Sequence, residues 1–243
     1  MKTTDFIHVL DREGRALAAA AETAGVDSAV PACPGWRVRE LVGHTGSVHR
    51  WARAYLTEGI AERRPLDPAP RLDGPELLEW YREGHRLLVG ALTDAPPDVD
   101  CFAFLPAPSP LAFWARRQAH ETAVHRYDAE SATGARPAPV TAEFAADGID
   151  EILRGFHARK RSRVRTESPR VLRVRATDVD DAVWTVRLSG EPPVTERTGT
   201  GPADCELSGP APELYLALWN RVPFPSVDGD GSLAELWSRR SAI

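Results

Sequence analysis

A carboxylate and an imidazole one helical turn apart mark the part of the chain that could do chemistry. Glu121 and His125 lie in the stretch 114–130, whose residue pattern predicts a helix. Because residues four apart on an α-helix lie nearly above one another, both side chains can point at a single ion or substrate atom. His120 lies five positions before His125 and points elsewhere. The stretch therefore differs from the His-Glu-x-x-His pattern of zinc proteases, in which the histidines are four apart.

The same pair has a simpler interpretation. Arg117 lies four residues before Glu121, so the carboxylate could pair with it on a solvated helix face. Trp114, Gln118 and Ala129 share the face of the pair, and this composition favours burial against another helix. The spacing alone leaves both interpretations open.

The best candidate for a third ligand comes from an earlier helix. His44 lies three residues after Leu41 and four before Val48, so it shares the helix face that we expect to be buried, whereas His49 lies nearer the flank. Taken alone, His44 fits the commoner role of a core histidine bonded to a carbonyl or hydroxyl group. If the two helices are neighbours, however, the three side chains form a ligand set that leaves a fourth position for water or substrate, as in catalytic zinc sites.

Hydrophobic periodicity predicts four amphipathic helices in the first half of the chain. Proline-rich or glycine-rich connections separate them, and four such helices in about 130 residues favour a four-helix bundle with its sites on facing helices. The third helix carries His85, whose spacing prefers neither a ligand nor a surface role. The predicted helices span about 4–23, from 38 onward, 74–93 and 111–131.

The pattern changes after the proline-rich segment that starts at residue 133. One more helix is predicted at 141–160, and its end carries a basic run, 159–165, that we interpret as a solvated linker. Period-two strands then follow, with two short helices after them. We expect an α+β chain with two domains, a bundle at 1–136 and a small α/β domain at 137–243. The strands are predicted at 171–176, 183–188 and 203–208, and the helices at 213–221 and 233–239.

Composition excludes several classes of partner. A net charge of −5 over 243 residues provides no general attraction to nucleic acid or to an anionic membrane. No apolar run approaches the roughly 20 residues that cross a bilayer, and the first residues lack the apolar core of a signal peptide, so we expect a cytoplasmic protein. The three cysteines are widely spaced without a Cys-x-x-Cys motif, which argues against a disulfide framework or a thiolate zinc site.

Four segments resemble, in the right order, the mycothiol-dependent maleylpyruvate isomerase family. One runs from Val30 through Pro-Gly-Trp-Arg-Val-Arg-Glu-Leu-Val-Gly to His44, and another is Arg-Arg-Gln-Ala-His-Glu-Thr-Ala-Val-His-Arg-Tyr-Asp at 116–128. The remaining two are Ala-Asp-Gly-Ile-Asp-Glu at 146–151 and the segment 207–221, which ends in Leu-Trp-Asn-Arg. The resemblance implies a DinB-like four-helix bundle with a metal held by His, Glu and His, followed by a small C-terminal α/β domain.

Position by position, the resemblance assigns the metal to His44, Glu121 and His125. It also matches Arg221 to an arginine that extends from the second domain towards the active site. Without the family, we would interpret Arg221 as a surface ion pair at a helix C-terminus, where the helix dipole favours a cation. One departure is Asn220, where relatives often have glycine after the Leu-Trp pair.

The function that follows is a zinc-dependent enzyme that uses a small thiol. The resemblance implies mycothiol as co-substrate, held as a thiolate at the open metal position, and a small electrophile as its target in an isomerase or S-transferase reaction. Histidine and carboxylate ligands also suit other divalent metals. Two alternatives remain, a metal-assisted hydrolase and a metal-stabilised binding protein without catalysis.

Overall fold

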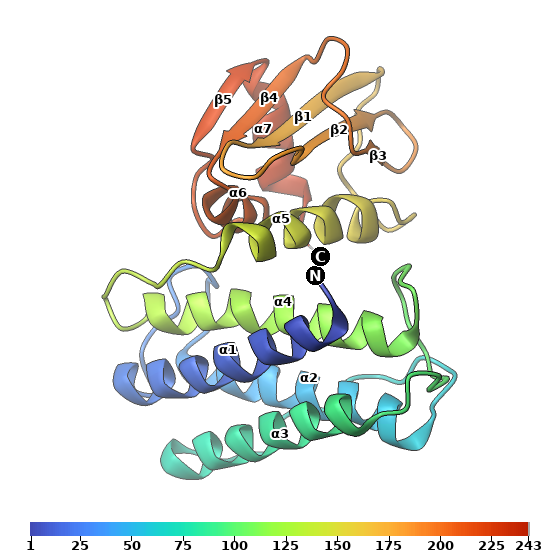
Figure 1. Cartoon of the computed structure of the whole chain (residues 1–243). Coiled ribbons are helices and arrows are strands. Elements are labelled where there is room, and N and C mark those ends of the chain that lie inside the picture. The colour runs from blue at the N-terminus through green and yellow to red at the C-terminus, as the bar shows by residue number, and fades with distance from the viewer. Residues whose placement is uncertain (243) are drawn as a thin grey trace. The chain divides into compact units, whose positions relative to one another are not determined.

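The structure is a computed structural model and describes residues 1–242. Contacts divide the chain into two compact units, Met1–Ala138 and Pro139–Ile243. The first unit holds the long helices and the second holds the sheet, as Figure 1 shows. The predicted two-domain α+β fold is confirmed. The boundary expected from the sequence, after residue 136, lies in the same proline-rich segment as the division in the structure.

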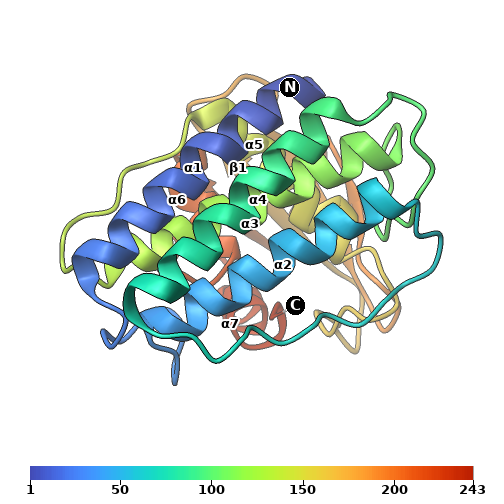
Figure 2. The ribbon, with the colours of Figure 1, turned by 90° about the horizontal axis from the view of Figure 1, so that it is seen from below.

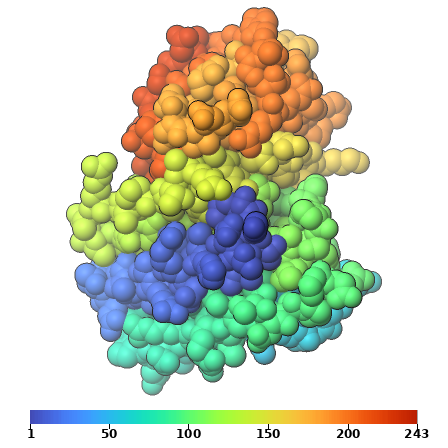
Figure 3. All heavy atoms as spheres, viewed as in Figure 1, coloured from blue at the N-terminus to red at the C-terminus, as the bar shows by residue number. Residues whose placement is uncertain are grey.

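Four helices form the first unit: α1 (Thr3–Ala24), α2 (Val38–Glu58), α3 (Gly74–Asp94) and α4 (Pro110–Ser131). Side-chain caps start the last two, because Asp73 accepts a hydrogen bond from the amide of Gly74 and Ser109 accepts one from the amide of Ala112. Figure 2 shows α3 lying between α1 and α2, and Figure 3 shows α1 and α3 side by side on one face of the bundle. The apolar stripes of the helices meet in a core that includes Leu10, Leu17, Leu41, Tyr81 and Leu88, all fully buried.

Helix α4 is polar in composition and yet buried along most of its length. Its burial is possible because its polar groups find partners inside the protein. Arg126 donates to Glu13 of α1 at 2.7 Å and to Glu130 one turn further along α4 at 2.7 Å. Arg126 also donates to the backbone carbonyl of Ala138, so the same guanidinium holds the segment that leaves the bundle.

Aromatic side chains fasten the loop between α3 and α4 to the bundle. The indole of Trp114 on α4 donates to the carbonyl of Phe102 at 2.9 Å and stacks on Tyr55 of α2 with ring centroids 5.0 Å apart. Phe104 packs edge-on against Phe113 at 4.7 Å. The loop aromatics therefore serve packing, which is one of the two roles that their sequence allows.

The second unit is a five-stranded sheet with helices packed against it. Helix α5 (Ala142–Asp150) continues into a π-helix, η1 (Glu151–Phe156), before the first strand. The sheet order is β3-β2-β1-β4-β5, in which β1 and β4 are parallel and the other pairs are antiparallel. The remaining elements are β1 (Arg170–Ala176), β2 (Val183–Leu188), β3 (Val194–Glu196), β4 (Cys205–Gly209), α6 (Ala211–Leu218), β5 (Ser226–Gly229) and α7 (Gly231–Arg240).

Alternation along β1 and β2 separates an apolar face from a polar face, and Arg173 and Thr185 of the polar face are buried as well. Leu172, Val174, Trp184 and Val186 are fully buried, and the indole of Trp184 donates to Asp150 of α5 at 3.0 Å. The neighbouring positions on these strands carry arginines and threonine. The helix predicted at 141–160 ends at residue 156, and β3 and β5 have no prediction from the sequence because strands of three and four exposed residues carry almost no alternation.

No helix formed by residues 1–242 is long and apolar enough to cross a membrane.

Three histidines are buried where a charge would be poorly solvated. Burial lowers the pKa of His49 well below its ordinary value, and the neighbouring His85 adds to the effect. Burial likewise lowers the pKa of His85, and it lowers that of His157 in the second unit to about 4. All three are therefore neutral in the folded protein at neutral pH.

We expect the free energy of unfolding to decrease as the pH falls below about 6.5, the ordinary pKa of histidine. The unfolded chain binds protons at these histidines below that pH, whereas the folded chain resists protonation until lower pH, so acid favours unfolding. Urea denaturation at about pH 6.5 and about pH 5 measures the change. Replacing the exposed His8 by Gln should leave the pH dependence intact. An unfolding free energy that stays constant across this range would contradict the prediction.

Candidate metal centre

The structure brings the three predicted ligands together inside the first unit. Nε2 of His44 on α2 and Nε2 of His125 on α4 both lie 3.3 Å from Oε1 of Glu121. One ligand atom from each residue lies within 4.8 Å of the other two, and no other group of this kind occurs among residues 1–242. The i, i+4 spacing on α4 and the packing of α2 against α4 produce this convergence.

The separations are long for charge-assisted hydrogen bonds and also match those of ligands that share an ion. Hydrogen bonds between an imidazolium and a carboxylate are typically about 2.7–2.9 Å long. Ligands about 2.1 Å from a tetrahedral metal lie about 3.4 Å apart, close to the two 3.3 Å distances. The donor set, two imidazoles and one carboxylate, is also one that open zinc sites use. The residues therefore fit a divalent cation.

Arg117 holds the second oxygen of the Glu121 carboxylate. Its guanidinium lies 3.1 Å from Oε2 and is buried, whereas the Glu121 side chain is 22% exposed. Burial by itself would raise the pKa of Glu121, but hydrogen bonds with His125 and His44 and the charge of Arg117 hold that pKa well below its usual range. The predicted pairing of Arg117 with Glu121 is thus present, but inside the protein and together with the histidines.

Asp128 orients His125 and was not among the site residues predicted from the sequence. Oδ2 of this fully buried aspartate lies 3.0 Å from Nδ1 of His125, which turns Nε2 of the ring towards Glu121. Burial opposes a charge on His125, but hydrogen bonds with Asp128 and Glu121 outweigh it and raise the pKa of His125 to about 9. A metal ion must displace this proton to bind. The i, i+3 spacing from His125 was the signal available in the sequence.

The ring of Trp36 packs against the two histidines of the candidate metal centre, His44 and His125. It lies in the turn before α2, and its ring centroid is 5.2 Å from that of His44 and 6.4 Å from that of His125, with the latter pair stacked. Cys33, in the same turn, donates through its thiol to Asp128 at 3.6 Å. The turn therefore contacts both histidine ligands and the aspartate that orients one of them.

The other histidines of the bundle lie outside this group. His120 is fully buried on α4 against the ring of Phe6, as its spacing indicates. His49 was expected near the flank of its helix, and this is wrong: it is fully buried, with Nε2 2.8 Å from the hydroxyl of Thr122. The inward position is stable because the hydroxyl satisfies one ring nitrogen.

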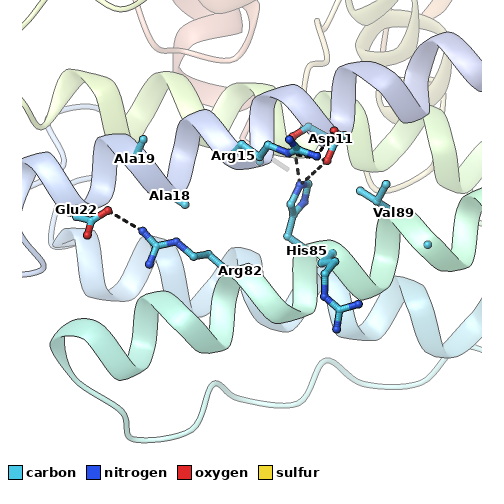
Figure 4. A pocket seen from close by; sticks show the side chains of 11 residues that line it. Asp11, Arg15, Ala18, Ala19, Glu22, Arg82, His85 and Val89 are labelled. Carbon is cyan, nitrogen blue, oxygen red and sulfur yellow. Dashed lines mark hydrogen bonds and ion pairs between the residues drawn. The ribbon is translucent and has the colours of Figure 1, made fainter.

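His85 lies at a separate groove between α1 and α3, with a volume of about 650 Å³. Figure 4 shows its imidazole pointing to Asp11, whose backbone carbonyl lies 3.3 Å from Nε2, and shows Arg82 paired with Glu22 across the same two helices. The ring fits against α1 because residue 14 is glycine; a Cβ there would lie only 2.2 Å from the imidazole. His85 is thus a helix-packing residue and not part of the metal centre.

Arg221 lies in the second unit, three residues after α6 ends at Leu218, whereas the sequence predicted a helix that extends to 221. Asn220 has φ +59°, in the left-handed region that glycine adopts most easily and asparagine next. The amide of Arg221 then returns to the carbonyl of Leu216 at 2.9 Å, and its guanidinium donates to the carbonyl of Trp219 at 2.8 Å. Asparagine can therefore replace the glycine seen in relatives without changing how the helix ends.

Replacing Asp128 by Asn should weaken metal binding by about 10- to 100-fold, the usual effect of removing a carboxylate that orients a histidine ligand. The amide has nearly the same shape but no negative charge, so the pKa of His125 should fall as well. Competition with a chromophoric chelator measures the metal affinity, and NMR titration of the imidazole measures the pKa. The control is Asp98→Asn, at an exposed aspartate of the same unit. Equal metal affinities in the two variants would refute the role of Asp128.

Comparisons with known proteins agree with this architecture. A family model described as the mycothiol maleylpyruvate isomerase N-terminal domain matches residues 7–130, and the C-terminal domain model of the same family matches residues 143–237. No curated protein matches the chain significantly by sequence.

Two solved structures of mycothiol-dependent maleylpyruvate isomerase have a similar fold at 12% sequence identity. One, a single-residue mutant, aligns with a TM-score of 0.61 over 89% of this chain and 88% of the other. The second aligns with a TM-score of 0.60 over 94% and 93%. At this identity the likeness establishes the fold, and the two domain models, matched in order over most of the chain, establish the family. The chain belongs to the mycothiol maleylpyruvate isomerase family of enzymes.

Proposed function

We propose that this protein is a metal-dependent enzyme that uses mycothiol in an isomerase or S-transferase reaction on a small electrophile. The observation that carries the proposal is the convergence of His44, Glu121 and His125 from two helices, with donor atoms at the spacing of metal ligands. Family membership supports the thiol and the class of reaction. The metal is zinc or another divalent ion, because the donor set suits several.

Each surrounding residue has a role in holding these ligands. Arg117 holds one oxygen of Glu121, so the other faces the two imidazoles. Asp128 holds the proton of His125 on Nδ1, which leaves Nε2 as the nitrogen that can bind the ion. Three protein ligands leave a further position for an exogenous group, and a divalent metal bound there would keep the thiol of the co-substrate in its thiolate form near neutral pH.

The thiol would supply the nucleophile for a small electrophile. With a cis-enedioate, addition of the thiolate would convert the double bond into a single bond that could rotate before the thiol was expelled, whereas with other electrophiles the sulfur adduct would be the product. We assign Arg221 to the carboxylate or enolate-like charge of the substrate, because a planar guanidinium binds such groups through two parallel hydrogen bonds.

The purified protein should contain nearly stoichiometric metal, and His44→Ala and Glu121→Ala should each lose most of it. Each variant removes one of only three protein ligands, and Glu121→Ala also leaves the buried Arg117 without that carboxylate. Elemental analysis after gel filtration measures the content, with His8→Ala as the control at an exposed histidine. Unchanged metal in both ligand variants would disprove the assignment, provided that circular dichroism shows them folded.

Consumption of an electrophile should require added thiol, and Arg221→Gln should reduce it without changing the metal content. The reason is that Arg221 is proposed to bind substrate and not metal. Turnover of a cis-enedioate with and without mycothiol measures the first effect, and Arg240→Gln is a control at an exposed arginine near the end of the same unit. Thiol-independent turnover would favour hydrolysis, and bound metal without turnover of any electrophile would favour a binding protein.

A further inference from the structure

The groove between α1 and α3 is a further cavity of the first unit, and the candidate metal ligands lie on the other two helices. Its volume is about 650 Å³. The lining positions on α1 run from Asp11 to Glu22, which spans about 16 Å at the helical rise of 1.5 Å per residue. Figure 4 shows the groove with the side chains that line it. A molecule bound here would be separate from the chemistry proposed for α2 and α4.

The floor of the groove is apolar because small residues line both helices. Ala18 and Ala19 belong to α1, and Val89 and Gly90 belong to α3. A Cβ added at Gly90 would meet no other part of residues 1–242 within 4 Å, so the space beside this residue is open. An extended hydrocarbon chain can lie along such a floor, and each methylene that it buries favours binding.

The rim of the groove carries more positive than negative charge. Arg15 pairs with Asp11 on the same helix at 2.8 Å. Arg82 pairs with Glu22 across the two helices at 2.7 Å. The exposed Arg86 also lines the groove, and among residues 1–242 it has no hydrogen-bond or ion-pair partner. Three arginines against two carboxylates leave a net charge of +1, which a single anionic group would balance.

One polar group in the floor is not fully bonded. The imidazole of His85 lines the groove, and its side chain is only 6% exposed. Nε2 donates to the backbone carbonyl of Asp11 at 3.3 Å, whereas Nδ1 has no hydrogen-bond partner among residues 1–242. Because burial lowers the pKa of this ring, it is neutral at neutral pH and Nδ1 is an acceptor. An acid group suits both features, because a carboxylate pairs with an arginine and a shared proton would bond Nδ1.

The shape of the groove favours a slender molecule over a protein segment. The ion pair between Arg82 and Glu22 joins α3 to α1 across one end of the groove, as Figure 4 shows. An α-helix with its side chains is about 10 Å across, so it could lie along the groove only if this pair were broken. An acyl chain is far narrower, and the length of the groove suits an extended chain better than a compact ring.

We propose that this groove binds a medium-chain carboxylic acid, with the head group at Arg86 and the hydrocarbon chain along the small residues of α1 and α3. The site is independent of the proposed function, since none of the three candidate metal ligands lines it. The chain supplies most of the affinity, because an exposed ion pair contributes little whereas apolar contact grows with each methylene.

The test follows the binding of hexanoate, octanoate and decanoate by NMR titration of the backbone amides of the full chain. The dissociation constant should fall about two- to fourfold for each added methylene, and the shifts should centre on α1 and α3. Arg86→Gln should weaken octanoate binding about fivefold, the upper effect for an exposed ion pair, and should leave octanol binding unchanged. Arg63→Gln, at an exposed arginine outside the groove, is the matched control.

A second variant tests the floor without removing a contact. Combining Ala19→Leu with Gly90→Leu places two side chains in the groove, and leucine at residue 90 also favours the helix, so the variant stays folded. It should remove the gain in affinity from hexanoate to decanoate. Thr57→Leu, at an exposed position of α2, should keep that gain.

The remaining outcomes overturn the proposal. Affinities that do not rise with chain length, shifts centred outside α1 and α3, or equal binding by the wild type and the floor variant would show that the groove is not an acyl site. Binding to vesicles of anionic phospholipid that Arg86→Gln abolishes, without binding of the free acids, would assign the groove to a lipid surface instead. Metal content and thiol-dependent turnover should be equal in all these variants, so failure here leaves the function proposed above in place.

Discussion

One carboxylate, that of Glu121, is the group on which the candidate centre depends. Its first oxygen faces two imidazoles at 3.3 Å and its second oxygen pairs with Arg117. A carboxylate in a protein interior is stable as an anion only when positive or donating groups surround it. Two of the groups that stabilise the anion, His44 and His125, are therefore also the groups that would share a metal ion with it.

The packing of the bundle core determines where the Glu121 carboxylate lies relative to His44. His44 and Glu121 lie 77 residues apart, so their contact depends on the rotation and height of α2 against α4. Aromatic packing between Tyr55 and Trp114 fixes one part of this interface, and the hydrogen bond between His49 and Thr122 fixes the part beside the ligands. On the other side of α4, the buried Glu13 and Arg126 pair ties it to α1. A polar helix is thus kept in the interior by partners on two neighbours.

Hydrogen bonds to Asp128 connect the candidate metal centre to the turn that precedes α2. The aspartate contacts both His125 and Cys33, and the turn that carries Cys33 also carries Trp36. Changes in that turn would therefore affect the orientation of His125 as well as the position of the Trp36 ring that stacks on it. In the second unit, the left-handed conformation of Asn220 turns the chain away from the helical path after α6, and this turn determines the position of Arg221. The candidate ligands thus lie within the helices of the bundle, whereas Arg221 lies in the turn that follows α6.

The sequence by itself determined the four long helices, the fold class and the i, i+4 pair on α4, because hydrophobic periodicity and residue spacing are local properties of the chain. It also identified His44 as a candidate, although a core histidine would give the same pattern. Whether His44 meets Glu121 and His125 was decided only by the tertiary structure, since that contact joins residues far apart in sequence. The same holds for the inward position of His49, the hydrogen bond from His125 to Asp128 and the stacking of Trp36 on His125. These depend on which helix faces which, and local periodicity does not contain that information.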